Sequence, residues 1–193
     1  MNGVDVDSLG LTIEAIQDQP ELGAAQFHGT SRWLDGHRVT TTIDRFDAGG
    51  GNHQRPLPHL LATDLPEALL GTDQGPSPLE AVLAALSSCV TTTLVTHASA
   101  KGIKLNSLDV IATGDIDLQG FLNIADIPAG YQHLNLAIVL RADLPAEEIQ
   151  SFVAFALRLS PVLDLLRRGA EVSVTQTSLD STSQSSTGSP SNS

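Results

Sequence analysis

Hydrophobic residues recur every three or four positions between Ser77 and Gly102, and this is the strongest pattern in the chain. Ser77 and Glu80 have the spacing of a capping box, and the proline that follows Ser77 suits the first helical position. No Asp, Glu, Lys or Arg occurs between Glu80 and Lys101. The pattern therefore predicts a long helix that is buried on nearly all sides.

Alternating apolar and polar positions predict strands elsewhere, and most of these strands come in pairs. Residues 22–33 and 37–46 are predicted to form a hairpin, because the Asp-Gly pair between them suits a tight turn. Residues 47–57, which include three successive glycines, are expected to form a loop. The same kind of pattern predicts further strands at 59–65, 105–118, 131–142 and 171–177.

Residues 144–159 carry a second amphipathic pattern, which predicts a helix that breaks at Ser160-Pro161. Proline disfavours helical geometry in the residue before it, and Ser160 suits the N-cap of a short helix that ends at Gly169. Paired strands with only two long helices indicate an α+β fold with antiparallel sheet rather than alternating βαβ units. Since one small sheet covers only one face of the central helix, we predict a homodimer in which a second subunit covers the rest.

The chain length of 193 residues favours one domain with tails. We assign residues 1–21 to a loose or helical N-terminal lead-in and residues 22–177 to a single α+β domain. Residues 178–193 are dominated by Ser, Thr, Gly and Pro. Such a composition buries too little apolar surface to fold, so we expect a disordered C-terminal tail.

The formal charge of −12 argues against nucleic acid as a partner, because phosphates repel an acidic surface. No run approaches the roughly 18 apolar residues expected of a membrane span. The acidic N-terminus lacks the pattern of a signal peptide. We therefore expect a cytoplasmic protein that has neither nucleic acid nor membrane as a partner.

A single cysteine forms neither an intramolecular disulfide nor a thiolate-rich zinc site. The six histidines show no ligand spacing, so we expect neither a metal nor a cofactor; they are His28, His37, His53, His59, His97 and His133.

Cys89 lies about three turns inside the central helix, which leaves two interpretations open. A structural role is one, because free cysteines are among the most buried residue types. A nucleophilic role requires the thiolate, and at this depth the dipole of the helix gives little help. A cation from elsewhere is then needed; the upstream candidates are Arg32, Arg38, Arg45 and Arg55.

Glu80 also has two interpretations. The capping box explains it on its own. It lies nine residues before Cys89, a separation of roughly 13.5 Å along a helix, so the two side chains do not touch within one helix. If both serve one site, either a long side chain bridges them or the carboxylate comes from a symmetry-related helix.

The stretch GTDQGPSPLEAVLAALSSC resembles the signature of the OsmC/Ohr family, in which a G-x-x-P-x-E segment opens a central helix with the reactive cysteine. KGIKLNSLDVIATGDIDL resembles the segment that follows, and LRLSPVLDLL resembles a second motif that usually reads C-P-V. The resemblance covers about residues 25–175. It implies an OsmC-like intertwined α+β homodimer, whose two central helices are enclosed by antiparallel sheets from both chains.

The better-known members of this family are thiol peroxidases that reduce organic hydroperoxides. Their first cysteine becomes a sulfenic acid, a second cysteine closes a disulfide, and an arginine held by the motif glutamate stabilises the thiolate. The resemblance thus implies that Cys89 is the peroxidatic residue and Glu80 the arginine-holding carboxylate. Ser160 takes the place of the second cysteine and cannot form a disulfide. Leu34 occupies the position where one branch of the family has its arginine, which leaves that role unassigned.

These implications predict a cytoplasmic, homodimeric OsmC-like protein with an antioxidant role in the stress response. Its activity would be that of a one-cysteine hydroperoxide reductase for organic peroxides, with an external thiol as reductant. The alternative is a non-enzymatic OsmC-like stress or ligand-binding protein that holds a small apolar ligand in the same cleft. A plain structural dimer, in which Cys89 is inert, is the remaining possibility.

Overall fold

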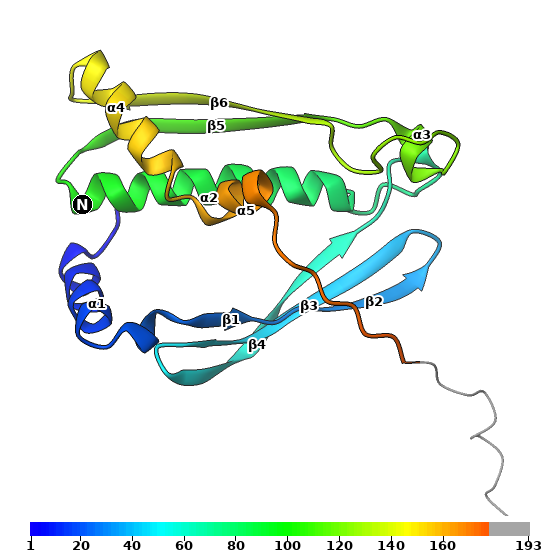
Figure 1. Ribbon diagram of the computed structural model, residues 1–193, viewed down its shortest axis with the longest axis horizontal. Helices are drawn as coiled ribbons and strands as arrows, with labels where there is room; N and C mark the ends of the chain where they lie inside the picture. Colours follow the sequence, from blue (N-terminus) through cyan, green and yellow to red (C-terminus); the bar gives the residue numbers. More distant parts are fainter. Residues whose placement is uncertain (178–193) are drawn as a thin grey trace, which may run out of the picture.

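The computed structural model describes residues 1–177, and the predicted tail at 178–193 lies outside the described residues (Figure 1). Five α-helices, two 3-10 helices and six strands follow one another along this part of the chain. In order they are α1 (Val6–Asp18), η1 (Pro20–Gly23), β1 (Ala25–Phe27), β2 (Thr30–Asp35), β3 (Arg38–Ala48), β4 (Gly51–Thr63), η2 (Glu67–Leu69), α2 (Pro78–Ala100), β5 (Leu105–Asp115), α3 (Leu118–Phe121), β6 (His133–Ala142), α4 (Ala146–Leu157) and α5 (Pro161–Arg168).

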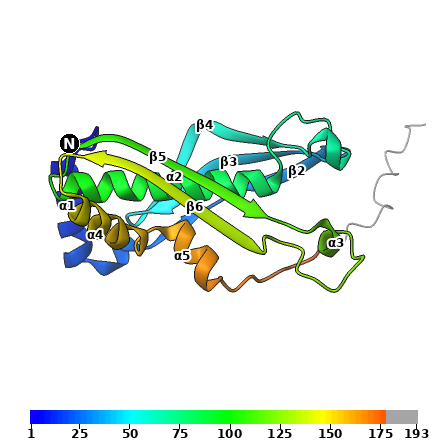
Figure 2. The ribbon, with the colours of Figure 1, turned by 90° about the horizontal axis from the view of Figure 1, so that it is seen from above.

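The strands form two antiparallel sheets on either side of α2 (Figures 1 and 2). In the larger sheet, β3 pairs with β1 and β2 along one edge and with β4 along the other. The smaller sheet is the hairpin of β5 and β6. Helices α4 and α5 pack beside α2. The predicted α+β class with antiparallel sheets is confirmed.

The central helix begins and ends as the sequence predicts. The backbone N–H of Glu80 donates to the Ser77 hydroxyl, and the Glu80 carboxylate accepts from the backbone N–H of Ser77, which completes the capping box. Gly102 follows the helix at φ +70°, a conformation that stops helices at little steric cost. The buried core lies along one side of α2 and includes residues of α4 and α5; its members are Leu86, Val90, Leu94, Ala98, Phe152, Ala156 and Leu163.

By length and mean hydropathy alone, α2 is also apolar enough to cross a membrane. The expectation that no segment is long and apolar enough for a membrane span is therefore wrong. Its polar residues are mainly Ser and Thr, which lower the hydropathy of a helix far less than charged residues do. Core helices of soluble proteins meet the same criterion, and α2 carries four residues of the buried core.

Two hairpin turns organise the larger sheet. The predicted turn between β2 and β3 is confirmed, with Gly36 at φ +50°. The loop expected at 47–57 is wrong, because β3 and β4 continue to within two residues of each other. Gly49 and Gly50 make the turn with φ values of +58° and +73°. Two successive positive φ values match the twist of a tight hairpin, and glycine adopts them without strain.

The strand predicted at 171–177 is also wrong. These residues pair with no described strand, and the Val172 and Val174 side chains are 80% and 87% exposed. An alternating sequence forms a strand only where another backbone satisfies its N–H and C=O groups. The described part of a single chain offers this segment no such neighbour.

The N-terminus is attached to the far end of α2. The Asn2 amide donates to the carbonyl of Ile103 at 2.9 Å and accepts from the N–H of Leu105 at 3.0 Å. The Ser99 hydroxyl donates to the carbonyl of Met1 at 2.9 Å. The predicted lead-in thus contains a helix, α1, whose start is held against the core helix.

Candidate functional site

The sulfur of Cys89 faces the beginning of α5. The Ser160 hydroxyl donates to the Cys89 Sγ at 3.4 Å, and the backbone N–H of Val162 donates to the same atom at 3.5 Å. Cys89 is half-buried and Ser160 is fully buried. The thiol predicted as reactive is therefore not surrounded by hydrocarbon alone, because two donors point at its sulfur.

The helix break at Ser160-Pro161 creates this arrangement. Ser160 is extended, with φ −78° and ψ 113°, and α5 restarts at Pro161 in a new direction. The first N–H groups of a helix have no partner within it. Val162 is the second residue of α5, so its N–H is one of these groups and is available to the sulfur.

The role that the sequence predicts for Ser160 needs correction. We expected its hydroxyl to cap α5, but within residues 1–177 it makes no capping hydrogen bond and donates to Cys89 instead. The only sequence signal for this contact is the second family motif. Local pattern could not have found it, because 71 residues separate the two positions.

Glu80 lies at the start of the same helix and completes the capping box. Its Oε2 accepts from the N–H and from the hydroxyl of Ser77, both at 2.7 Å. These two hydrogen bonds, the backbone one first, lower the pKa of the Glu80 carboxyl. Among the described residues no cation forms an ion pair with Glu80. The structure brings Cys89 and Ser160 together, whereas it leaves Cys89 and Glu80 apart on α2.

Tyr131 is a residue near Glu80 that the sequence analysis did not single out. Its hydroxyl donates to the carbonyl of Leu79 at 2.8 Å. Gly114 leaves room for the Tyr131 ring, since a Cβ at that position would lie 2.6 Å from Tyr131 Cε1. Burial, and secondarily the negative charge of Glu80, raises the pKa of Tyr131. The segment that leads into β6 is thereby joined to the first turn of α2.

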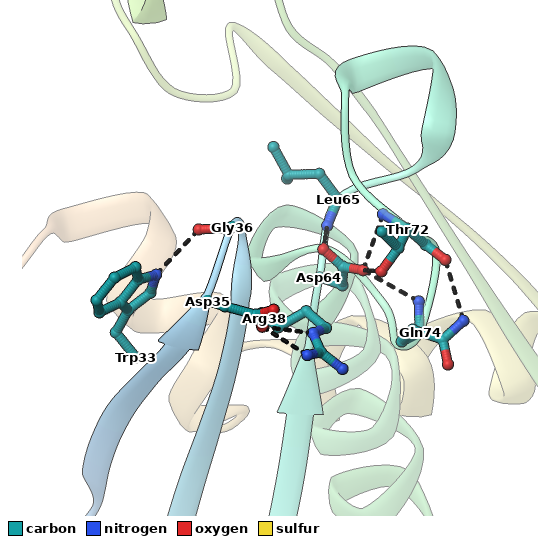
Figure 3. A network of polar contacts seen from close by, with 8 residues as sticks. All are labelled: Trp33, Asp35, Gly36, Arg38, Asp64, Leu65, Thr72 and Gln74. Atoms are coloured by element: carbon teal, nitrogen blue, oxygen red, sulfur yellow. Dashed lines mark hydrogen bonds and ion pairs between the residues drawn. The ribbon is translucent and has the colours of Figure 1, made fainter.

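The four candidate arginines differ in their partners, and in the described part of the chain none donates to Cys89. Arg38 pairs with Asp35 at 2.6 Å in the turn between β2 and β3 (Figure 3). The Arg55 guanidinium lies 4.8 Å from the centre of the Phe46 ring. Its Nη1 is the one buried side-chain nitrogen or oxygen without a hydrogen-bond partner among residues 1–177.

The loop that leads into α2 is organised by one buried carboxylate, Asp64 (Figure 3). Asp64 is 1% exposed and accepts hydrogen bonds from Leu65, Thr72 and Gln74, the shortest from the Thr72 hydroxyl at 2.6 Å. These hydrogen bonds, led by that of Thr72, lower the pKa of Asp64 from 3.8 to about 2. Sequence pattern did not indicate this role, because a single Asp in a loop has no periodicity.

A groove of about 470 Å³ lies between β6, α4 and α5, with Leu86 of α2 in its lining. Its walls are mainly leucine and isoleucine side chains. Phe152 and Phe155 do not line this groove; they line a different hollow, together with Lys101.

In residues 1–177, no three His, Cys, Asp or Glu side chains gather in a geometry that suits a metal ion. The candidate site consists of one sulfur with two hydrogen-bond donors, and Leu86, one helical turn before Cys89, lines the apolar groove.

Comparison with known proteins adds the following findings. The model of a family described as OsmC-like protein matches residues 71–175, which is more than half of the chain. An OsmC-like protein from Mycoplasma pneumoniae is similar in structure, with a TM-score of 0.59 and 22% identity over 75% of this chain and 89% of that chain. An OsmC-like protein of unknown function from Vibrio cholerae has a TM-score of 0.50 and 15% identity over 72% of this chain and 92% of that chain. No curated protein matches this chain.

Proposed function

The chain belongs to the OsmC-like protein family, and from this premise we propose that it is a one-cysteine, thiol-dependent hydroperoxide reductase that acts on organic peroxides. One observation carries the proposal: the Cys89 sulfur accepts from the Ser160 hydroxyl and from the Val162 N–H. Donors that point at a sulfur stabilise negative charge on it, and the thiolate is the nucleophilic form of cysteine.

In the first step the Cys89 thiolate attacks the terminal oxygen of the hydroperoxide. A sulfur–oxygen bond forms, the peroxide oxygen–oxygen bond breaks, and the alkoxide takes a proton from water and leaves as an alcohol. The peroxide is reduced by two electrons, and the sulfur is oxidised to a sulfenic acid. Ser160 and Val162 orient the sulfur through their hydrogen bonds, and neither residue is consumed in the reaction.

The second step requires a thiol from outside the chain. Cys89 is the only cysteine, and the Ser160 hydroxyl cannot form a disulfide. One external thiol attacks the sulfenic sulfur, forms a mixed disulfide and releases water. A second external thiol then releases the Cys89 thiolate and leaves as a symmetrical disulfide. In total, one hydroperoxide and two thiols give one alcohol, one water and one disulfide.

For Glu80 we infer a second role beside the capping box, which is to hold an arginine near the sulfur. Arg55 is the candidate that we favour, because its buried Nη1 has no acceptor among residues 1–177. An unsatisfied buried donor costs roughly 1–3 kcal/mol, and a carboxylate would remove that cost. Both hydrogen bonds from Ser77 to the Glu80 carboxylate end on Oε2. Glu80 therefore suits this role, because Oε1 is left to accept from an arginine.

The active form is inferred to be an intertwined homodimer with two central α2 helices enclosed by the sheets of both chains. Strands β2 and β4 are exposed at nearly every position in the single chain. Phe27, Trp33 and Leu57 are 70–81% exposed, and apolar side chains gathered on one sheet call for a partner surface.

The cellular setting that we propose is the cytoplasm, with a role in the stress response to organic peroxides. The acidic charge of −12 supports the absence of nucleic acid and of anionic membrane from its partners. The proposed domain runs over residues 22–177, preceded by the lead-in at 1–21.

The decisive experiment follows consumption of cumene hydroperoxide by the purified protein in the presence of dithiothreitol. We expect turnover by the wild type and none by Cys89→Ser, with one added oxygen on Cys89 by mass spectrometry when the reductant is left out. Wild-type protein that consumes no peroxide faster than Cys89→Ser would exclude the reductase. A native thiol that also resists alkylation would leave only an inert, structural cysteine.

A non-enzymatic ligand-binding role is the second candidate, and the groove of about 470 Å³ is the observation that favours it. The same assay separates the two, because a protein that only binds a ligand consumes no peroxide faster than Cys89→Ser does.

A further inference from the structure

A second hollow lies away from the thiol, where the end of α2 meets the first turns of α4 (Figure 1). Its volume of about 500 Å³ is within the range of roughly 300–1,000 Å³ that is common for small-molecule sites. Phe152 and Phe155 supply the aromatic part of its lining, and Lys101, Glu147 and Glu148 supply the charged part. The hollow therefore combines an aromatic surface with charges of both signs.

The position of this hollow separates it from the candidate site. Neither Cys89 nor Ser160 belongs to its lining. Lys101 follows Cys89 by twelve residues, a distance of roughly 18 Å along a helix. A ligand in this hollow would not touch the sulfur.

The Phe155 ring already carries a cation. The Lys101 Nζ lies 4.7 Å from the centre of the ring, and the His97 ring meets the ring edge-on with the two centres 5.5 Å apart. Phe152, one turn earlier on α4, is 6% exposed and belongs to the buried core. A positive charge is attracted to the face of an aromatic ring. The hollow thus has an aromatic surface, anchored in the core, whose chemistry suits an ammonium group.

Two carboxylates share the hollow with one ammonium. Glu147 and Glu148 lie in the first turn of α4, and neither forms an ion pair with any residue in 1–177. The dipole of α4 stabilises carboxylates at this position, so the two glutamates alone would not indicate a ligand. Lys101, however, lies on the Phe155 ring and leaves both carboxylates unpaired. The lining therefore has one negative charge in excess and can accept a second cation.

We propose that this hollow binds a small organic ammonium, namely a primary amine that carries an aromatic ring. The ammonium group donates to the carboxylates of Glu147 and Glu148, and the ring packs against the phenylalanine side chains. Lys101 is exposed and competes with the ligand for the Phe155 ring. The binding does not depend on any reaction of Cys89, so the inference goes beyond the proposed function.

The test is a titration of the full-length protein with phenethylamine, phenethyl alcohol and hydrocinnamate, which share a phenylalkyl body and differ in the charge of the head group. Amide proton–nitrogen NMR spectra give the Kd and locate the site. We expect phenethylamine to bind about tenfold more tightly than the alcohol, the scale of a charge-assisted hydrogen bond. It should shift the amide signals of residues 101–103 and 147–155. Hydrocinnamate is expected to bind more weakly than both.

Substitutions of the charged lining should act in opposite directions. The double variant Glu147→Gln, Glu148→Gln should lose the preference for the amine over the alcohol. Lys101→Gln should strengthen amine binding about threefold, because it removes a like charge and frees the aromatic face. Glu14→Gln and Lys104→Gln change the same charges outside the hollow and should leave the Kd of the amine unchanged.

Any of three results would overturn the proposal. Phenethylamine that binds no more tightly than the alcohol would show that no ammonium site exists. A loss in Glu14→Gln equal to that in the double variant would show attraction by the overall charge. Weaker amine binding in Lys101→Gln than in the wild type would show that Lys101 supports the ligand instead of competing with it. All the replaced side chains are exposed, so each variant is expected to fold, and its melting curve verifies this.

The variant Cys89→Ser separates this inference from the proposed function. It should bind phenethylamine as the wild type does while reducing no cumene hydroperoxide. A wild-type protein that prefers the amine but reduces no peroxide would contradict the reductase alone. A wild-type protein that reduces cumene hydroperoxide but shows no preference for the amine would contradict the ammonium site alone.

Discussion

The hydroxyl oxygen of Ser160 lies 3.4 Å from the sulfur of Cys89, although 71 residues separate the two along the chain. Ser160 is fully buried, and the core residue Leu163 holds the following helix in place. A sulfur atom introduced in place of the Ser160 hydroxyl would therefore start close to Cys89.

Substitution Ser160→Cys is accordingly expected to create a two-cysteine protein. One equivalent of peroxide should join the introduced thiol to Cys89 in a disulfide, seen as the loss of two hydrogens in the intact mass and of both free thiols. Ser160→Ala provides the control, because it removes the hydroxyl without adding a thiol. If Ser160→Cys instead accumulates sulfinic acid as readily as the control, the two side chains do not meet in solution.

Two substitutions separate the capping role of Glu80 from its proposed role at the thiol. Ser77→Ala should lower the free energy of unfolding by about 1 kcal/mol, as is usual for a lost N-cap, and leave the peroxide rate nearly unchanged. Glu80→Gln preserves a capping-box acceptor but removes the charge. It should reduce the peroxide rate about tenfold, the scale of one charge-assisted hydrogen bond, with little loss of stability.

Chemical denaturation and stopped-flow kinetics on the same preparations measure both quantities. Equal rates in Glu80→Gln and wild type would confine Glu80 to the helix cap.

Asp64 is expected to make stability dependent on pH in the acid range. Its pKa is lowered from 3.8 to about 2 in the folded chain, so between these values the unfolded chain binds more protons. The stabilisation is complete above about pH 4 and is lost as the pH falls through about 2. Asp64→Asn should be less stable at neutral pH, because an amide replaces one acceptor oxygen with donors that face the donors of Thr72 and Gln74.

Urea unfolding of both proteins at several pH values between neutrality and about 2 measures this effect. The difference in the free energy of unfolding should narrow toward the acid end of this range. A difference that stays constant would show that these contacts do not lower the pKa of Asp64.

The exposed Leu57 of β4 provides a test of the proposed homodimer. The side chain is 81% exposed in the single chain, and a charged residue at a buried interface lacks a partner. Leu57→Glu should shift the protein from dimer toward monomer, measured by sedimentation velocity over a range of concentrations. Wild-type protein that sediments as a monomer throughout would contradict the dimer itself.

Several elements could be predicted because their causes are local. The capping box of Ser77 and Glu80 depends on residues three positions apart, and the break at Ser160-Pro161 follows from the geometry of proline. The hairpin at Gly36 likewise needs only its own turn residues. The alternation of apolar and polar residues was sufficient to predict β5 and β6, because the two strands are close in the chain and pair with each other.

Other features escaped the sequence analysis because their partners are distant or their signal is ambiguous. Three glycines suit a flexible loop as well as a tight turn, and only the register of β3 with β4 decides between them. Residues 171–177 alternate like a strand, yet no described strand pairs with them. Asp64 acquires its hydrogen bonds from a loop whose course no periodic pattern specifies.

The chain by itself determined that Cys89 lies well inside a helix without Asp, Glu, Lys or Arg after Glu80, and that a second helix begins after Ser160. It did so because capping, helical periodicity and proline sterics act within a few residues. Only the tertiary structure decided that the Ser160 hydroxyl and the Val162 N–H meet the sulfur. The packing of α4 and α5 against α2 places these atoms, and such packing depends on contacts between residues far apart in the chain.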